Sequence, residues 1–306
     1  MRILISGSTG LLGTSVIRRL EGEGHEAVRL VRPATRAIPA MASAKTILWD
    51  PSGNQFDAAK ADGADALVHL AGASIADGRW NAARKNLLRT SRIDATRHLI
   101  AALSGLQRPP AVIVSASAIG YYGNRADEEL TESSAPGNDF LAKLCVDWEA
   151  EVARATQFGV RAVMLRFGII LAAHGGALPR MVLPFKLGVG GKLGSGRQWM
   201  SWLTLEEAVN MIHFALMNAA LTGPANAVTP APVRNADFTR ALAKVLHRPA
   251  LFPAPAFALR LALGEMAGSL LLASQLVVPS KPAACGYNFL HTDLNLALKS
   301  ALEPVV

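Results

Sequence analysis

The stretch that decides the fold is LISGSTGLLGTSVIRRL, residues 4–20. A short apolar run leads into glycines at positions 7, 10 and 13, and a helical pattern follows at once. A phosphate-binding turn needs this order, because glycines permit a tight turn and the helix N-terminus then meets phosphate oxygens. A purely structural glycine turn is the alternative. We favour a dinucleotide site formed by Gly7, Ser8, Thr9, Gly10, Leu11, Leu12 and Gly13.

The composition indicates a soluble globular chain. It has 306 residues, 51% of them hydrophobic and 18% charged, which is enough apolar surface for a sizeable core. The most apolar stretch, residues 254–279, is interrupted by Arg260 and Glu265, so it predicts buried helices rather than a membrane span. Two cysteines without CxxC spacing make no disulfide framework or zinc motif. We therefore expect a cytoplasmic protein and no metal site.

The formal net charge of +8 could serve a nucleic acid, a membrane or a phosphate-bearing ligand. The densest basic patch, residues 79–99, carries Lys85, Arg89 and Arg92 at helical spacing. We interpret it as a solvated helix face, because neither a nucleic-acid module nor aromatic interleaving accompanies it. We therefore expect a small-molecule substrate as the partner, and neither a nucleic acid nor a membrane. For the oligomeric state, we consider a homodimer.

Strand and helix patterns alternate through the first 172 residues. Short β-branched runs followed by longer amphipathic stretches predict an α/β fold of the Rossmann type, with a doubly wound parallel sheet. The candidate strands are RILISG, EAVRLVR, KTILW, ALVHLAG, AVIVSAS and RAVMLRFGIIL. We assign residues 1–172 to an NADP-binding domain, joined by a returning strand at 226–230. Residues 173–306 begin with a Gly- and Pro-rich segment and predict a smaller, mostly helical substrate-binding region.

The end of the second strand, VRLVRPATR (residues 28–36), selects the cofactor. Arg32 stands where an acidic residue would bind a ribose 2′-OH, and Arg29 and Arg36 lie close by in the sequence. Arginines there favour a 2′-phosphate, so we predict NADP(H), with NAD(H) as the other candidate. The alternative interpretation is that these arginines are ordinary surface residues that bind no cofactor.

The ends of the later strands complete the predicted site, because open α/β sheets bind ligands at the carboxyl ends of their strands. We assign to the cofactor Asp50, Leu70, Ala71, Gly72 and Ser115. His69 is interpreted as a buried, hydrogen-bonded histidine. The run VSASAIGYYG (residues 114–123) predicts the reacting edge.

Several motifs together resemble a known superfamily. The segments GSTGLLG, LVHLAGA, SASAIGYYG, FLAKLCVDWE and LRFGIIL are similar to those of the extended short-chain dehydrogenases/reductases of the NAD-dependent epimerase/dehydratase type. The run LGEMAGSLLLASQLVVPSKPAACGYNF resembles the "epimerase family protein" subgroup, which carries a C-terminal domain of unknown function. The resemblance implies that a Ser or Thr, a Tyr and a Lys hold the substrate beside the nicotinamide.

The Tyr–Lys pair that the resemblance implies is missing. When this helix is aligned with the family on Glu149, Leu141 occupies the position of the Tyr and Cys145 occupies that of the Lys. Lys143 lies about 200° around the helix from the face that residues 141 and 145 share, and we expect it to pair with Asp139 instead. For Cys145, a buried apolar cysteine is favoured over a reactive thiol.

The remaining catalytic candidates are Ser117, Tyr121 and Tyr122. Tyr122 aligns with a Tyr that the family uses structurally, so Tyr121 is the freer proton donor. For the substrate we assign Arg166, Arg197 and Trp199. Two functions stay open: an NADP-dependent oxidoreductase or epimerase acting on a polar substrate such as a nucleotide-linked sugar, and a non-catalytic NADP(H)-binding sensor or interaction protein.

Overall fold

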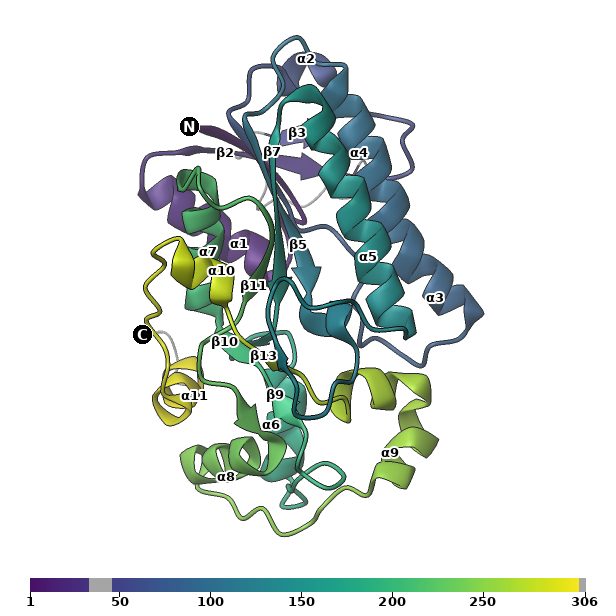
Figure 1. Ribbon diagram of the computed structural model, residues 1–306, viewed down its shortest axis with the longest axis vertical. Helices are drawn as coiled ribbons and strands as arrows, with labels where there is room; N and C mark the ends of the chain where they lie inside the picture. The colour runs from purple at the N-terminus through teal and green to yellow at the C-terminus, as the bar shows by residue number, and fades with distance from the viewer. Residues whose placement is uncertain (33–45, 303–306) are drawn as a thin grey trace.

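The protein is built on a seven-stranded parallel sheet with helices on both faces (Figure 1). We describe it from a computed structural model, which covers residues 1–32 and 46–302. In spatial order the strands are β11 (Gly223–Ala227), β7 (Arg161–Phe167), β5 (Val112–Ala118), β4 (Ala66–His69), β1 (Arg2–Ser6), β2 (Glu26–Val31) and β3 (Thr46–Leu48). This order, with both faces covered, confirms the predicted Rossmann-type doubly wound α/β fold.

The sheet separates two hydrophobic clusters because successive side chains of a strand point to opposite faces. In β1, Ile3 and Ile5 belong to one cluster and Leu4 to the other. The first face is covered by α1 (Leu11–Gly22) and α7 (Leu205–Met217), which pack against each other. The second face is covered by α3 (Ala82–Arg89), α4 (Ala95–Ser104) and α5 (Phe140–Ala153). Both faces of the central strands are therefore buried.

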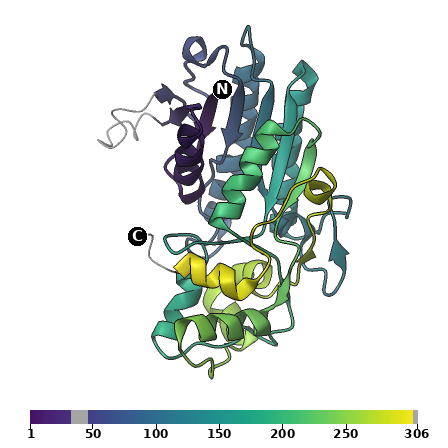
Figure 2. The ribbon, with the colours of Figure 1, turned by 90° about the vertical axis from the view of Figure 1, so that its left-hand side faces the viewer.

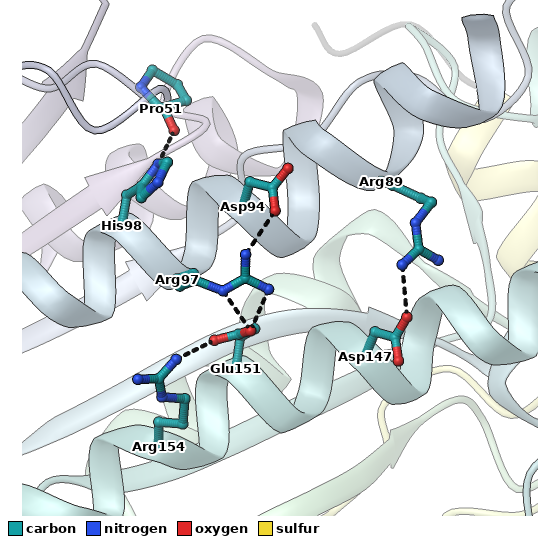
Figure 3. Close-up of polar contacts among 8 residues, drawn as sticks. All are labelled: Pro51, Arg89, Asp94, Arg97, His98, Asp147, Glu151 and Arg154. Carbon is teal, nitrogen blue, oxygen red and sulfur yellow. Dashed lines mark hydrogen bonds and ion pairs between the residues drawn. The ribbon is translucent and has the colours of Figure 1, made fainter. Parts of the chain in front are cut away.

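Ion pairs join the helices of the second face on their outer side (Figure 3). Arg89 on α3 lies 3.1 Å from Asp147 on α5, and Arg97 on α4 contacts Glu151 at 2.7 Å and Asp94 at 3.0 Å. The basic face expected between residues 79 and 99 is thus partly neutralised by Asp94, directly before α4, and by acidic side chains of α5. Among the residues the structure describes, no helix combines the length and apolar character required to cross a bilayer.

The C-terminal region has a hydrophobic cluster of its own, which includes Leu178, Trp202, Phe238 and Leu298. Figure 2 shows its helices packed below the sheet, with α11 against α8. Its larger elements are α6 (Leu178–Lys186), α8 (Asn235–Leu246), α9 (Ala256–Leu263), α11 (Leu294–Leu302), β8 (Ile169–Leu171) and β10 (Trp202–Thr204). The short elements of the chain are α2 (Ala58–Ala61), α10 (Ser280–Ala284), β6 (Glu129–Leu130), β9 (Trp199–Met200), β12 (Val233–Arg234) and β13 (Leu276–Val277).

Three segments differ from the sequence-based expectation. The Gly- and Pro-rich segment contains α6, which begins Leu178-Pro179 and so places a proline where a helix tolerates it. The predicted strand RAVMLRFGIIL is divided at Gly168, where an added Cβ would lie 2.5 Å from the Ser201 carbonyl oxygen; β8 then pairs with β10 instead of the main sheet. A π-helical turn at Thr90–Asp94 separates α3 from α4 within the helix expected at 80–103.

Candidate functional site

The glycine loop between β1 and α1 packs closely against neighbouring backbone, which only glycine permits at two of its positions. Gly7 has φ +68°, and a Cβ added to it would lie 2.6 Å from the Leu70 carbonyl carbon. A Cβ on Gly13 would lie 2.2 Å from the Gly7 carbonyl oxygen. The N-cap of α1 is Gly10, and no side chain caps this helix end. Because the first N–H groups of a helix have no intrahelical acceptor, this turn offers several donors to an anion.

A groove of about 690 Å³ opens beside this loop, at the carboxyl ends of β1, β2, β3 and β4. Eight of the residues assigned to the cofactor line it: Gly7, Ser8, Thr9, Gly10, Arg32, Leu70, Ala71 and Gly72. Leu11, Leu12 and Gly13 form the first turn of α1 directly after them. A groove of this size accommodates a ligand as large as a cofactor.

Arg32 follows the second strand and lies at the groove, and Arg29, within the strand, bonds to a residue that lines it. Arg32 is exposed and lines it. Arg29 donates from Nη1 to the Ser8 carbonyl at 3.1 Å, while its buried Nε has no hydrogen-bond partner among the described residues. A buried donor without a partner is costly, so this position of Arg29 lowers the stability of the described part of the chain. The predicted contribution of Arg36 lies outside the described residues.

The third strand contributes to the groove through Trp49, Pro51 and Ser52. Asp50 itself is half-buried and accepts hydrogen bonds from the backbone N–H and the hydroxyl of Ser52. These bonds lower the pKa of the Asp50 carboxyl group. Asp50 therefore shapes the turn that carries the lining residues, and its assignment to the cofactor stays a prediction.

His69 and Ser115 are buried within the sheet. The His69 ring contacts Ser6 Oγ at 2.6 Å and Thr96 Oγ1 at 2.9 Å, and burial lowers its pKa to about 4. It is therefore neutral and structural, in agreement with the sequence interpretation. Ser115 is fully buried and donates to the Ala116 carbonyl, so the structure places its hydroxyl away from the groove surface.

Three predicted site residues meet in one buried polar network. Ser117 Oγ donates to Glu149 Oε1 at 2.6 Å. Arg166 donates to both oxygens of Glu149 at 2.8 Å, and also to the Tyr122 hydroxyl at 2.9 Å. Tyr122 in turn donates to Asn226 Oδ1 at 2.6 Å. The network joins β5, α5, β7 and β11, and it engages two of the three hydroxyls that were predicted to react, those of Ser117 and Tyr122.

Burial governs the chemistry of this network. The Arg166 and Glu149 side chains are only 2% and 8% exposed. Burial raises the pKa of Tyr122 to about 12, against the lowering effect of the Arg166 charge. Tyr122 and Arg166 are thus structural here, and the catalytic role predicted for Tyr122 and the substrate contact predicted for Arg166 find no support in this geometry.

The face of α5 expected to carry the Tyr–Lys pair is apolar. Leu141 and Cys145 are 6% and 4% exposed, and burial raises the pKa of the Cys145 thiol to about 12. A thiol with that pKa stays protonated and unreactive at neutral pH. Asp139 caps α5 by accepting from the Ala142 N–H at 2.8 Å; within the described ranges it forms no ion pair with the exposed Lys143, so that predicted pair was wrong.

Tyr121 is the one predicted catalytic hydroxyl that the network leaves free. Its ring is half-buried, and Arg166 Cζ lies 3.4 Å from the ring centre. Its hydroxyl has no hydrogen-bond partner among residues 1–32 and 46–302. A phenol held by its ring, with its oxygen unengaged, can still exchange a proton with a bound substrate.

Arg92 is a residue whose position the sequence did not reveal. It was expected on the solvated face, but its guanidinium group packs under Gly72 and lies 5.4 Å from the Trp148 ring. It donates to the Ala73 carbonyl at 2.9 Å and, in the described part of the chain, pairs with no carboxylate. Burial lowers its pKa, and the neutral Cys145 thiol lies close to the guanidinium group. A positive charge thus stands beside the position that the resemblance gives to a Lys.

Arg197 and Trp199 lie in the C-terminal region. Trp199 stacks on Arg234, whose Cζ is 4.1 Å from the ring centre, and donates from Nε1 to Asp127 at 3.1 Å. Arg197 is exposed, and its carbonyl accepts a hydrogen bond from Arg234. The structure brings these two residues to one surface, but neither lines the groove.

The sheet order and the glycine loop define a Rossmann-type α/β protein, and comparison with known proteins gives its family. Residues 3–228 match the model of the NAD dependent epimerase/dehydratase family, and residues 254–301 match a domain of unknown function, DUF1731. The chain belongs to the NAD dependent epimerase/dehydratase family. The combination of the two matches confirms the predicted resemblance to epimerase family proteins.

Similar proteins extend from bacteria to mammals. An epimerase family protein of Mycobacterium bovis is 40% identical over 97% of this chain and 96% of its own length. The crystal structure of human epimerase family protein SDR39U1 with NADPH has a TM-score of 0.90 and 31% identity, with full coverage of both chains. A nucleoside-diphosphate sugar epimerase from Corynebacterium glutamicum has a TM-score of 0.80 and 35% identity, over 99% of this chain and 58% of that chain.

Proposed function

We propose that the protein binds NADP(H) in the groove beside the glycine loop. The observation that carries this proposal is the combination of an uncapped α1 N-terminus with Arg32 at the same groove and Arg29 hydrogen-bonded to the carbonyl of Ser8, which lines it. The loop amides would hold the diphosphate, and the two guanidinium groups would meet the 2′-phosphate. The NADPH in the human SDR39U1 structure supports this choice over NAD(H). When bound, the cofactor supplies a hydride donor or acceptor.

Replacing Arg32 with Glu is expected to weaken NADPH binding well over tenfold, because a charge-assisted contact is exchanged for repulsion of a phosphate. Binding of NADH, which lacks the 2′-phosphate, should change far less. Titration of protein fluorescence or calorimetry with both cofactors measures the two dissociation constants. Arg18→Glu, a change at an exposed position of α1, is the matched control. Equal losses in the two variants would contradict a direct contact.

For the reaction we propose an oxidoreductase or epimerase that acts on a polar small molecule, with a nucleotide-linked sugar as the first class to test. The substrate would lie between residues 1–172 and 173–306, with Tyr121 moving the proton and Arg92 supplying positive charge. The name of the corynebacterial neighbour supports this class. Turnover is expected to be slow, because a positioned acid–base pair contributes about 10²–10⁴ in rate and no Tyr–Lys pair stands on α5. A cytoplasmic location and a homodimer remain predictions.

A second function, NADP(H) binding without turnover, is favoured by one observation. Ser117 is engaged by Glu149, and the α5 face that should carry the catalytic pair is buried by Leu141 and Cys145. A sensor or interaction protein would keep the cofactor groove and need no reactive hydroxyl. The two functions differ in a single measurable property, which is hydride transfer from the bound cofactor.

A panel of carbonyl compounds and nucleotide-linked sugars, followed at the 340 nm absorbance of NADPH, distinguishes the two functions. We expect substrate-dependent change with at least one member. Tyr121→Phe should then lower kcat about 100-fold, since it removes only the proton-donating hydroxyl, and leave the NADPH dissociation constant unchanged. NADPH binding without any absorbance change across the panel would favour the sensor, and an unaffected Tyr121→Phe variant would remove Tyr121 from the proposal.

A further inference from the structure

Three side chains with metal-ligating atoms gather at the opposite end of the sheet from the groove. They are Glu23 just after α1, His25 just before β2, and His213 on α7. His213 Nε2 lies 2.7 Å from Glu23 Oε2, and the two imidazole ring centres are 6.5 Å apart. One candidate ligand atom from each residue lies within 4.8 Å of the others.

Local structure explains how residues far apart in sequence meet here. Gly24 has φ +80°, and the turn that it makes places Glu23 and His25 side by side. The N–H of His25 donates to the Leu20 carbonyl at 2.9 Å, which fixes this turn against the end of α1. The packing of α1 on α7 then brings His213 to the same point. The cluster therefore combines one helix residue with two residues of a hydrogen-bonded turn, and these positions are held by the packing of α1 on α7.

We propose that Glu23, His25 and His213 bind a divalent cation of the zinc type, with solvent in the remaining coordination position. Two imidazole nitrogens and one carboxylate oxygen form a ligand set that Zn²⁺ accepts readily, in tetrahedral geometry with one open position. The ion would replace the proton shared between His213 and Glu23. It would link the α1–β2 turn to α7.

The surrounding charges set the expected affinity. Two cations face the cluster and oppose the metal: Arg19, whose Nε is 2.7 Å from Glu23 Oε1, and the Met1 amino group, 3.2 Å from His25 Nδ1. With these neighbours and an open position, we expect a dissociation constant on the order of 10 µM, far weaker than closed structural zinc sites.

Calorimetry of the full-length, EDTA-treated protein with ZnCl₂ alone tests the proposal. We expect one saturating site per chain and a rise in Tm with added Zn²⁺, because a ligand that binds only the folded state stabilises it. His213→Ala and His25→Ala should each weaken this site at least about tenfold. His174→Ala, at an exposed histidine outside the cluster, should leave it unchanged.

Other outcomes decide against the site. Absence of any site tighter than about 1 mM would overturn the proposal, as would a site that His213→Ala leaves intact. Circular dichroism identifies a variant that fails to fold, in which case Glu23→Gln, which keeps the side-chain shape, gives the same test. None of these measurements involves NADPH, so failure here leaves the proposed function untouched.

Discussion

Replacing Gly13 with Ala is expected to weaken NADPH binding at least about 100-fold, which corresponds to about 2.7 kcal/mol. The reason is steric. The new methyl group would lie 2.2 Å from the Gly7 carbonyl oxygen and 2.9 Å from its carbonyl carbon. Both atoms belong to the backbone, so the loop must move away from α1, and its amides would no longer point together at a diphosphate.

Gly22→Ala is the control for this prediction, because Gly22 ends the same helix and an added Cβ there meets nothing within 4 Å. It should leave the NADPH affinity unchanged and cost no stability, since Ala is the better helix former. Calorimetry gives both dissociation constants, and thermal unfolding reports whether each variant folds. A folded Gly13→Ala variant that binds NADPH with unchanged affinity would show that the loop does not hold the cofactor.

Replacing Glu149 with Gln is expected to lower the free energy of unfolding by about 3–5 kcal/mol, since removing one partner of a buried ion pair leaves an uncompensated charge. Arg166 would keep its charge at 2% side-chain exposure, opposite an uncharged amide, with the Tyr122 hydroxyl and the Glu132 carbonyl as its further acceptors in the described part of the chain. Ser117 would lose its carboxylate acceptor as well. Urea unfolding, followed by circular dichroism, measures the change.

Asp147→Asn on the same helix is the matched control. Asp147 pairs with Arg89 where the two side chains are 44% and 46% exposed, so this change should cost less than about 1 kcal/mol. If both variants lose a similarly small free energy of unfolding, the buried network contributes no more to stability than a surface ion pair does. Ser117 would then be free to act on a substrate, and the interpretation of the network as structural would be wrong.

The fold could be predicted because its signals are local. The glycines at positions 7, 10 and 13 lie within seven residues, from the end of an apolar strand to the first turn of an amphipathic helix. Alternating strand and helix patterns then predict the parallel sheet, and the observed strand order agrees. The departures also have local causes, since Gly168 divides one predicted strand at a backbone contact and Pro179 begins a helix inside a segment read as loop.

The site could be predicted only in part, because its remaining contacts join distant residues. Ser117 and Glu149 are 32 positions apart, and nothing in either motif indicates that their side chains bond. Helical spacing placed Arg92 with Lys85 and Arg89, yet the π-helical turn at residues 90–94 turns it under the loop that follows β4. Glu23 and His213 are separated by most of the chain, so the metal-ligating cluster depends on the packing of α1 against α7.

The central claim is that the glycine loop and its neighbouring arginines bind the phosphorylated pyridine nucleotide. Calorimetric titration of the purified protein with NADPH and, separately, with NADH tests it most directly. We expect one site per chain for NADPH, with a dissociation constant at least about tenfold lower than that for NADH, the difference arising from the 2′-phosphate. Absence of binding by either nucleotide at millimolar concentration, or tighter binding of NADH, would contradict the claim.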